Sequence, residues 1–350
     1  MKLRNRLLPV LLAAALCIPA AGCSVDKSWA VKDSSTTVPV GVYIYNLYSA
    51  YEQADTTKKT DASKSVLDQK IDNKDAKTWI REKALTNTRM TILLDKKLKE
   101  MKLTFNATNK KTAADMNSQV WTSYSKNFES YGIAQSSFEL AYGTTVEKQR
   151  MIFDAIYGKN GTKPVSDADL KAYYTKDYTD FSYMVVPLYT TDSSGNYSAA
   201  LTDAQKKAAK KVFDEYAEKI KAGTITMTQA GADYKTAKKS SEDLLHTATV
   251  NLATDTTFPT ELKTAIKAMK VGDVKTVDLS QQQAYVLLYK EDSNKSAETK
   301  ISTADGRESL LTAFKSQEFT AELEKEADAM TGISVNSKAL DSYDPKMFVS

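Results

Sequence analysis

Apolar residues spaced three and four apart recur through the first half of the chain and predict helices. The clearest stripe runs from about Asp75 to Met101, and its opposite face is rich in Lys, Glu and Asp, as expected of a solvated surface. Shorter helices are predicted over about 42–54, 120–128, 142–157 and 166–176. The break at Tyr131-Gly132 separates two of them. The pattern to residue 176 therefore predicts a mainly helical region.

The pattern changes at Phe181, where the run FSYMVVPL predicts a buried strand. Thr202 and Gln205 then form a capping-box pattern, which predicts a helix that ends near Gly223. Strands are predicted over 274–279 and 284–289, joined by a turn of three glutamines. Together these elements predict an α+β domain over 179–292. A helical stripe returns over 303–330 and is expected to pack on the N-terminal helices.

The N-terminus has a basic start and then an apolar run from Leu7 to Ile18 that is too short to span a bilayer. The run leads to Ala20-Ala21-Gly22-Cys23. This ending resembles the lipobox of bacterial lipoproteins, which implies cleavage before Cys23 and attachment of a lipid to its thiol. An ordinary secretory signal with an incidental cysteine is the alternative. The lipobox reading predicts a cell-membrane protein, lipid-anchored through Cys23 and facing the extracytoplasmic side.

Removal of the signal changes the composition of the chain. Residues 1–22 hold three of the 48 basic residues and none of the 44 acidic ones, so the mature chain carries a net charge of about +1. Such a balance gives no reason to expect nucleic acid as a partner. The other cysteine, Cys17, lies in the signal, so stability must come from packed cores without disulfides.

The order of lipobox, N-terminal helices, α+β domain and returning helix resembles the PrsA/SurA-type foldases. The most similar segments are WIREKALTNTRMTILLDKKLKEMKL at 79–103, VSDADLKAYYTKDYTDF at 165–181 and VGDVKTVDL at 271–279. The resemblance implies an α+β fold class: a helical chaperone domain with an inserted parvulin-like peptidyl-prolyl isomerase domain. The implied organisation is a signal at 1–22, a flexible tether at 23–37, a helical domain at 38–178, a parvulin-like domain at 179–292, a C-terminal helix at 293–336 and a tail at 337–350.

The catalytic positions depart from the parvulin pattern. By the resemblance, Tyr183 stands where the first core histidine is expected and Val286 where the second is expected. Asp243 is retained from the Gly-Gly-Asp-Leu-Gly turn, and Asp233 is the one residue that could serve as the acidic group expected before that turn. Tyr183, Asp233 and Asp243 are therefore the catalytic candidates. His246 is the only histidine in the chain, which excludes a dual-histidine network.

Apolar residues of the α+β domain supply candidates for substrate binding. Phe258, Met269 and Tyr285 could line a proline pocket, although residues of this kind more often fill a core. His246 could be a displaced acid or base, but a loop or strand-start histidine of no special role is the simpler interpretation. No phosphate loop, nucleophile elbow or cysteine cluster occurs, so no metal and no cofactor are expected.

Three functions are weighed. The leading hypothesis is a membrane-anchored chaperone or foldase whose partners are unfolded or nascent secreted proteins, and dimerisation through the helical part is left open. Seven aromatic residues are candidates to line its client-binding surface: Tyr43, Tyr45, Trp79, Trp121, Tyr124, Phe128 and Tyr142. An active parvulin-type isomerase is the alternative, and the missing histidines argue against it. A solute-binding lipoprotein is disfavoured, because strands and helices do not alternate through two lobes.

Overall fold

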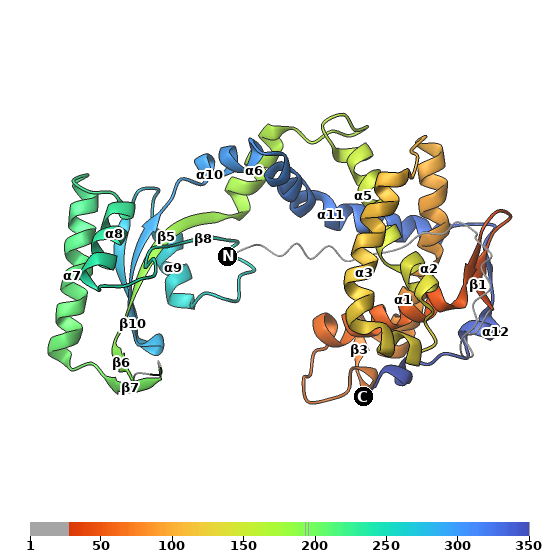
Figure 1. Ribbon diagram of the computed structural model, residues 1–350, viewed down its shortest axis with the longest axis horizontal. Coiled ribbons are helices and arrows are strands. Elements are labelled where there is room, and N and C mark those ends of the chain that lie inside the picture. The colour runs from red at the N-terminus through yellow and green to blue at the C-terminus, as the bar shows by residue number, and fades with distance from the viewer. Residues whose placement is uncertain (1–27, 193, 195, 350) are drawn as a thin grey trace. The chain divides into compact units, whose positions relative to one another are not determined.

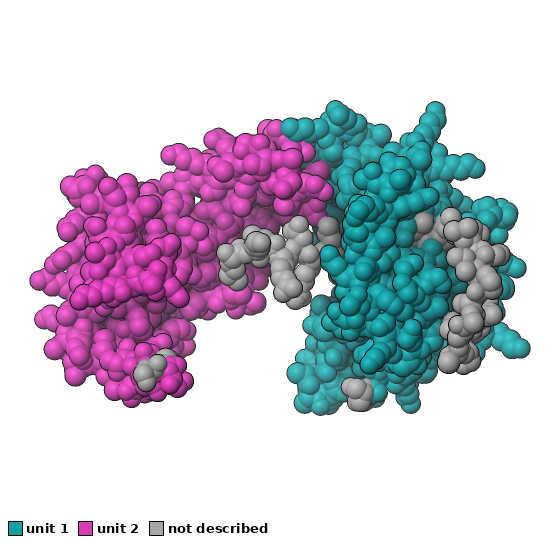
Figure 2. Space-filling model, in the orientation of Figure 1, with its two compact units in different colours: residues 1–165, 315–350 teal, residues 166–314 magenta. Residues whose placement is uncertain are grey.

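The computed structural model describes residues 28–192, 194 and 196–349, and Cys23 and the signal lie outside them. The fold is α+β and divides into two compact units (Figures 1 and 2). The helical unit comprises residues up to 165 together with 315–350, and the α+β unit comprises 166–314. The chain enters the α+β unit once and leaves it once, so this unit is an insertion in the helical one.

Helices α1 and α2 form the centre of the helical unit. Its elements are β1 (Trp29–Lys32), β2 (Thr37–Pro39), α1 (Val40–Gln53), β3 (Lys70–Ile71), β4 (Lys74–Asp75), α2 (Ala76–Glu100), α3 (Ala107–Ser130), α4 (Gln135–Ala141), α5 (Gly143–Tyr157), β11 (Ser334–Val335) and α12 (Ser337–Leu340). The predicted helix from Asp75 is confirmed, because the Asp75 carboxylate accepts hydrogen bonds from the first backbone N–H groups of α2. Gly132 adopts φ +82° and stops α3 at the predicted break.

Part of the segment expected to be a flexible tether, 23–37, is folded in the structure. β1 pairs with β2 and β11, and the side chains of Ala30 and Val31 are fully buried. The turn between β1 and β2 is held by the Asp33 carboxylate, which accepts from the backbone N–H groups of Ser35 and Thr36 and pairs with Lys96. Four apolar residues are too few for a periodic signal, so the sequence pattern missed these strands.

The expected tail over 337–350 is also part of the fold. Leu340 and Phe348 are buried in the core of the helical unit, and the Phe348 ring contacts Tyr131 edge-on with centroids 4.9 Å apart. The helix predicted over 303–330 is confirmed as α11 (Ala304–Ala329), and the C-terminal segment expected at 293–336 also contains a separate helix, α10 (Ser293–Ile301). α10 packs against α6 (Asp167–Asp177) within the α+β unit, and α11 belongs to the helical unit only from Lys315 onward.

A four-stranded antiparallel sheet forms the α+β unit, in the order β8-β5-β10-β9. Its remaining elements are β5 (Thr179–Pro187), β6 (Tyr189–Thr191), β7 (Tyr197–Ala200), α7 (Asp203–Lys221), α8 (Met227–Ala237), β8 (His246–Val250), α9 (Thr260–Ala268), β9 (Val274–Leu279) and β10 (Ala284–Lys290). Helices α7 and α8 cover one face of the sheet and α9 covers the other (Figure 1). The predicted capping box is confirmed, because Thr202 and Gln205 exchange hydrogen bonds at the start of α7.

Candidate functional site

The two faces of the sheet follow from the alternation of side chains along its strands. Phe181 and Tyr183 of β5 point toward α9, and Met184 and Val186 point toward α7 and α8. The register pairs Val185 with Val286 of β10, so the same alternation continues across the sheet. Each face carries its own buried cluster, and near the end of β5 each cluster gives way to an open groove.

The smaller groove has a volume of about 250 Å³ and lies on the α9 side; we call it the α9 groove. Its walls are almost wholly apolar. They comprise Tyr183, Val185, Pro187, Tyr189, Phe258, Pro259, Leu262, Leu279, Gln282, Ala284 and Val286. The Phe258 ring packs edge-on against Phe181 and Tyr183, with centroids 5.3 and 6.0 Å away. The Asp255 carboxylate fixes the turn before it by accepting from the Phe258 N–H at 2.9 Å.

Tyr183 lines the α9 groove, and His246 lies beside it on β8. They face each other in the β5–β8 register, with ring centroids 5.2 Å apart. Burial raises the pKa of the Tyr183 phenol, so the hydroxyl stays protonated at neutral pH and is not a base. His246 is exposed to solvent. The pair can donate or accept hydrogen bonds, but it is not the enclosed, polarised pair that acid–base catalysis uses.

The other candidate residues do not converge on Tyr183. Asp233 lies on the exposed side of α8, which packs on the opposite face of the sheet. Asp243 is exposed in the loop before β8, where the hydrogen bond from Lys235 at 2.6 Å lowers the pKa of its carboxyl. Met269 is buried in the cluster beneath α9 and does not line the α9 groove, while Tyr285 packs on the α7 side. Of the three proposed pocket residues, only Phe258 reaches this groove.

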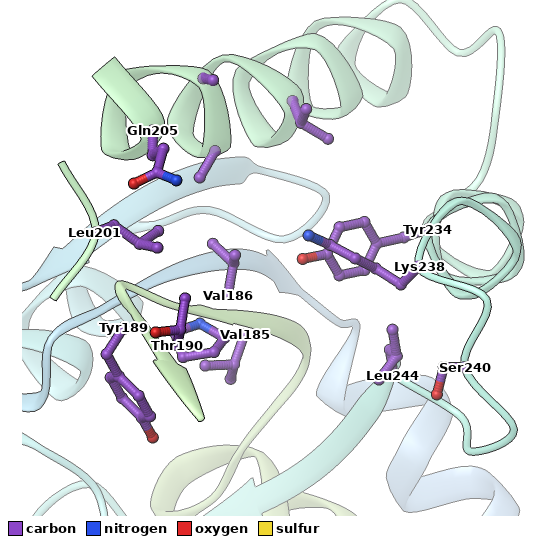
Figure 3. Close-up of a pocket in the computed structure, with 14 residues that line it drawn as sticks. Val185, Val186, Tyr189, Thr190, Leu201, Gln205, Tyr234, Lys238, Ser240 and Leu244 are labelled. Carbon is purple, nitrogen blue, oxygen red and sulfur yellow. The ribbon is translucent and has the colours of Figure 1, made fainter. Parts of the chain in front are cut away.

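The larger groove has a volume of about 660 Å³ and lies between β5 and helices α7 and α8; we call it the α7 groove (Figure 3). The sequence pattern did not predict it. Its lining comprises Val185, Val186, Pro187, Tyr189, Thr190, Leu201, Gln205, Ala208, Ala209, Val212, Tyr234, Lys238, Ser240 and Leu244. Lys238 extends along the ring of Tyr234, with its ammonium 5.5 Å from the ring centroid. The exposure of Val212, at 40%, marks the uncovered part of α7.

The seven aromatic residues expected to line a client-binding surface in the helical unit differ in how far they are exposed. Tyr43, Tyr45 and Phe128 are buried in the core, which leaves them no exposed ring surface. Trp79, Trp121 and Tyr142 are half-buried, and Tyr124 is 51% exposed. An aromatic rim surrounds Phe128 and Phe138. It comprises Trp121, Tyr142, Tyr124, Tyr48, Tyr51 and Tyr131. The rim is partly open to solvent.

Further chemistry is sparse in the part of the chain that the structure describes. No group of three or more His, Cys, Asp or Glu residues within 28–349 is arranged to hold a metal ion. No described helix is both long and apolar enough to cross a membrane. What the described residues offer is therefore apolar surface beside a few hydrogen-bonding groups.

Comparison with solved structures finds foldase proteins over most of the chain. Foldase protein PrsA from Lactococcus lactis is 17% identical, with a TM-score of 0.33 over 90% of this chain and 97% of that one. PrsA from Streptococcus pneumoniae is 16% identical, with a TM-score of 0.30 over 76% and 94%. PrsA from Bacillus subtilis is 18% identical, with a TM-score of 0.29 over 85% and 99%. No family model matches the sequence, and no curated protein gives a significant match.

Proposed function

We propose that this protein is a chaperone of the foldase type that binds unfolded polypeptide segments outside the cytoplasm. The observation that carries the proposal is the pair of apolar grooves at the end of β5, both open and both lacking an acid–base pair. Apolar grooves with a few hydrogen-bonding groups are a common form of binding site, and large contiguous apolar patches on soluble proteins mark interaction surfaces. The aromatic rim of the helical unit, with Tyr124 exposed, supplies a second surface of the same character.

We further propose that the mature protein is tethered by a lipid on Cys23. Two acyl chains hold a protein at a bilayer far more firmly than one, since each buried CH₂ contributes about 0.8 kcal/mol. A Cys23→Ser variant is expected to lose incorporation of labelled palmitate and to appear in the culture medium. Retention of the variant in the membrane fraction would contradict the lipid anchor and leave the chaperone proposal intact.

The chaperone proposal is tested with a reduced, aggregating client protein and a soluble mature chain carrying Cys23→Ser. We expect suppression of light scattering at about stoichiometric amounts, because binding is weak and does not turn over. Full aggregation at a several-fold excess of the chain would refute the proposal. A chain with Tyr124→Ser serves as a matched variant, because it removes an exposed ring without disturbing the core.

A working prolyl isomerase is the alternative function, and the α9 groove is where it would act. Isomerisation must overcome a barrier of about 18–20 kcal/mol. Val286, at the second expected histidine position, is buried and apolar, and Tyr183 stands at the first. We therefore expect no catalytic acceleration of proline-limited refolding at substoichiometric amounts. Acceleration that scales with enzyme concentration would favour the isomerase.

A further inference from the structure

One edge of strand β5 is only partly paired. β8 pairs with β5 from Thr179, opposite Val250, to Tyr183, opposite His246, and stops there. β10, on the other side, pairs with β5 as far as Pro187. The last part of β5, after Tyr183, therefore has a neighbouring strand on one side only.

The ladder geometry identifies which backbone groups face the unpaired side. In antiparallel pairs, the residues that exchange hydrogen bonds alternate with residues that do not. The Leu188 N–H donates to the Gln283 carbonyl at 2.7 Å, and the Glu291 N–H donates to the Asp180 carbonyl at 3.0 Å. On the β5 side, these two hydrogen bonds involve the even-numbered residues Asp180 and Leu188. Even-numbered residues of β5 are therefore the ones that exchange hydrogen bonds with β10. The N–H and C=O of odd-numbered Val185 therefore point away from β10, toward the position that β8 would fill if it continued.

The segment before β8 is held back from this edge. A Cβ at Gly231 of α8 would lie 2.8 Å from the Cβ of Leu245, so the missing side chain lets Leu245 pack closely on that helix. The ion pair between Lys235 and Asp243 holds the same loop to α8. Among the described residues, no turn, loop or cap hydrogen bond reaches the backbone of Val185, and its side chain is 36% exposed.

The free edge lies where the two grooves meet. Val185, Pro187 and Tyr189 line both the α9 groove and the α7 groove. An extended segment laid beside Val185 would present successive side chains to opposite faces of the sheet, and hence alternately to the two grooves. Pro187 has no N–H, so it limits how far such pairing can extend and keeps the edge from recruiting long strands.

The positive charge of Lys238 in the α7 groove indicates which charged side chains a bound segment can carry there. Lys238 lies in its lining, and no described carboxylate forms an ion pair with it. On the loop before β8, the Asp243 carboxylate is already paired with Lys235. An acidic side chain on the bound segment would complement this ammonium, whereas a basic one would be repelled.

We propose that the free edge of β5 at Val185 binds a short extended segment of an unfolded polypeptide by adding it as a strand. Alternate apolar side chains of the segment enter the α9 and α7 grooves, and an acidic side chain pairs with Lys238. This inference rests on the proposed chaperone function and specifies how its clients bind. Recognition through backbone hydrogen bonds tolerates many sequences, which suits a binder of diverse unfolded chains.

The edge is tested with a fluorescent eight-residue peptide of valine and threonine that places a valine in each groove and one glutamate on the α7 side. Val185→Pro removes the outward N–H but also replaces the side chain and restricts the backbone at Met184, whereas Val185→Ala keeps the N–H and trims the side chain. We expect about tenfold weaker binding in anisotropy titrations for the proline variant and about threefold for the alanine variant, since a hydrogen bond contributes on the order of a factor of ten. Thermal melting of both variants checks that the unit remains folded.

A second measurement uses the unaltered protein and is independent of folding effects. The same peptide is N-methylated at alternate residues, so that the N–H groups that face β5 are lost. It is expected to bind about tenfold more weakly. Amide exchange at Val185 is expected to slow when the unmethylated peptide is bound. Equal binding of both peptides, or unchanged exchange at Val185, would overturn strand addition.

Charge is tested with Lys238→Glu and a peptide in which lysine replaces the glutamate. We expect the variant to prefer the lysine peptide and the unaltered chain to prefer the glutamate peptide, each by about threefold to fivefold. Unchanged preference would overturn the role of Lys238. If Val185→Pro still suppresses client aggregation fully, the edge is not the client site and the chaperone proposal stands; if the unaltered chain fails to suppress aggregation, the chaperone proposal itself fails.

Discussion

The helical unit closes most of its aromatic residues into a core, whereas the α+β unit leaves apolar residues uncovered at the end of its sheet. Phe138 is fully buried and contacts Tyr45, Phe128 and Tyr142, with ring centroids 5.0 to 5.3 Å away. Val185, in contrast, is exposed between two grooves. The difference indicates that the apolar surface a unit exposes depends on where packing stops, and less on how many apolar residues the unit contains.

The largest expected effect comes from opening the closed unit. Phe138→Ala should lower the free energy of unfolding by about 3–5 kcal/mol, because it removes a fully buried ring and leaves a cavity. Tyr124→Ala, at an exposed ring, should cost less than about 1 kcal/mol. Urea unfolding followed by circular dichroism measures both. Similar losses for the two variants would show that the rim is as tightly packed as the core.

Acid should weaken the helical unit through Asp33. Burial opposes ionisation there, but hydrogen bonds from the backbone N–H groups of Ser35 and Thr36 outweigh it and lower the pKa from 3.8 to about 2. A depressed folded-state pKa contributes stability that is complete above about pH 4 and is lost as the pH falls toward 2. The contribution is about 2 kcal/mol at most.

Unfolding of the unaltered chain and of Asp33→Asn at pH 5 and pH 2.5 checks this expectation. The difference in stability between them should shrink on acidification by about 2 kcal/mol at most. Ser34→Ala, at an exposed neighbouring position, should show no such pH dependence. A constant difference between the unaltered chain and Asp33→Asn would argue against a depressed pKa.

Phe258→Ala should enlarge the α9 groove and so increase the difference between the open α+β unit and the closed core of the helical unit. Because the ring is half-buried, the free energy of unfolding should fall by only about 1–2 kcal/mol. Binding of the valine–threonine peptide should weaken about threefold, since one wall of the groove is lost. Lys267→Ala on the exposed side of α9 is the control. Unchanged peptide binding would remove the α9 groove from the client site.

Tyr183→Phe should have the smallest effect. The phenol stays protonated and has no described hydrogen-bond partner, so its loss should change stability by less than about 0.5 kcal/mol. Aggregation suppression and proline-limited refolding should both be unchanged. A slower refolding rate with this variant alone would identify the hydroxyl as part of a catalytic site.

Local signals in the sequence predicted the elements well wherever a side chain acts on its own neighbourhood. Thr202 with Gln205 forms the predicted capping box, and Ser166 with Asp169 forms another, because a cap depends on residues three apart. The glutamine turn joins β9 and β10 as expected, with Gln283 at φ +47°. Strands β1 and β8 escaped prediction, because their few apolar residues form strands only beside distant partners, β11 and β5.

The sequence by itself determined the α+β class, the long helices and the presence of a single histidine, since composition and periodicity are properties of the chain alone. The tertiary structure decided which apolar residues are core and which are surface. The sequence pattern does not distinguish Met269 from Phe258. Met269 is buried beneath α9, whereas Phe258 lines the α9 groove. The unpaired edge at Val185 exists only because β8 begins two residues too late to cover it, and a strand's end is set by its partners.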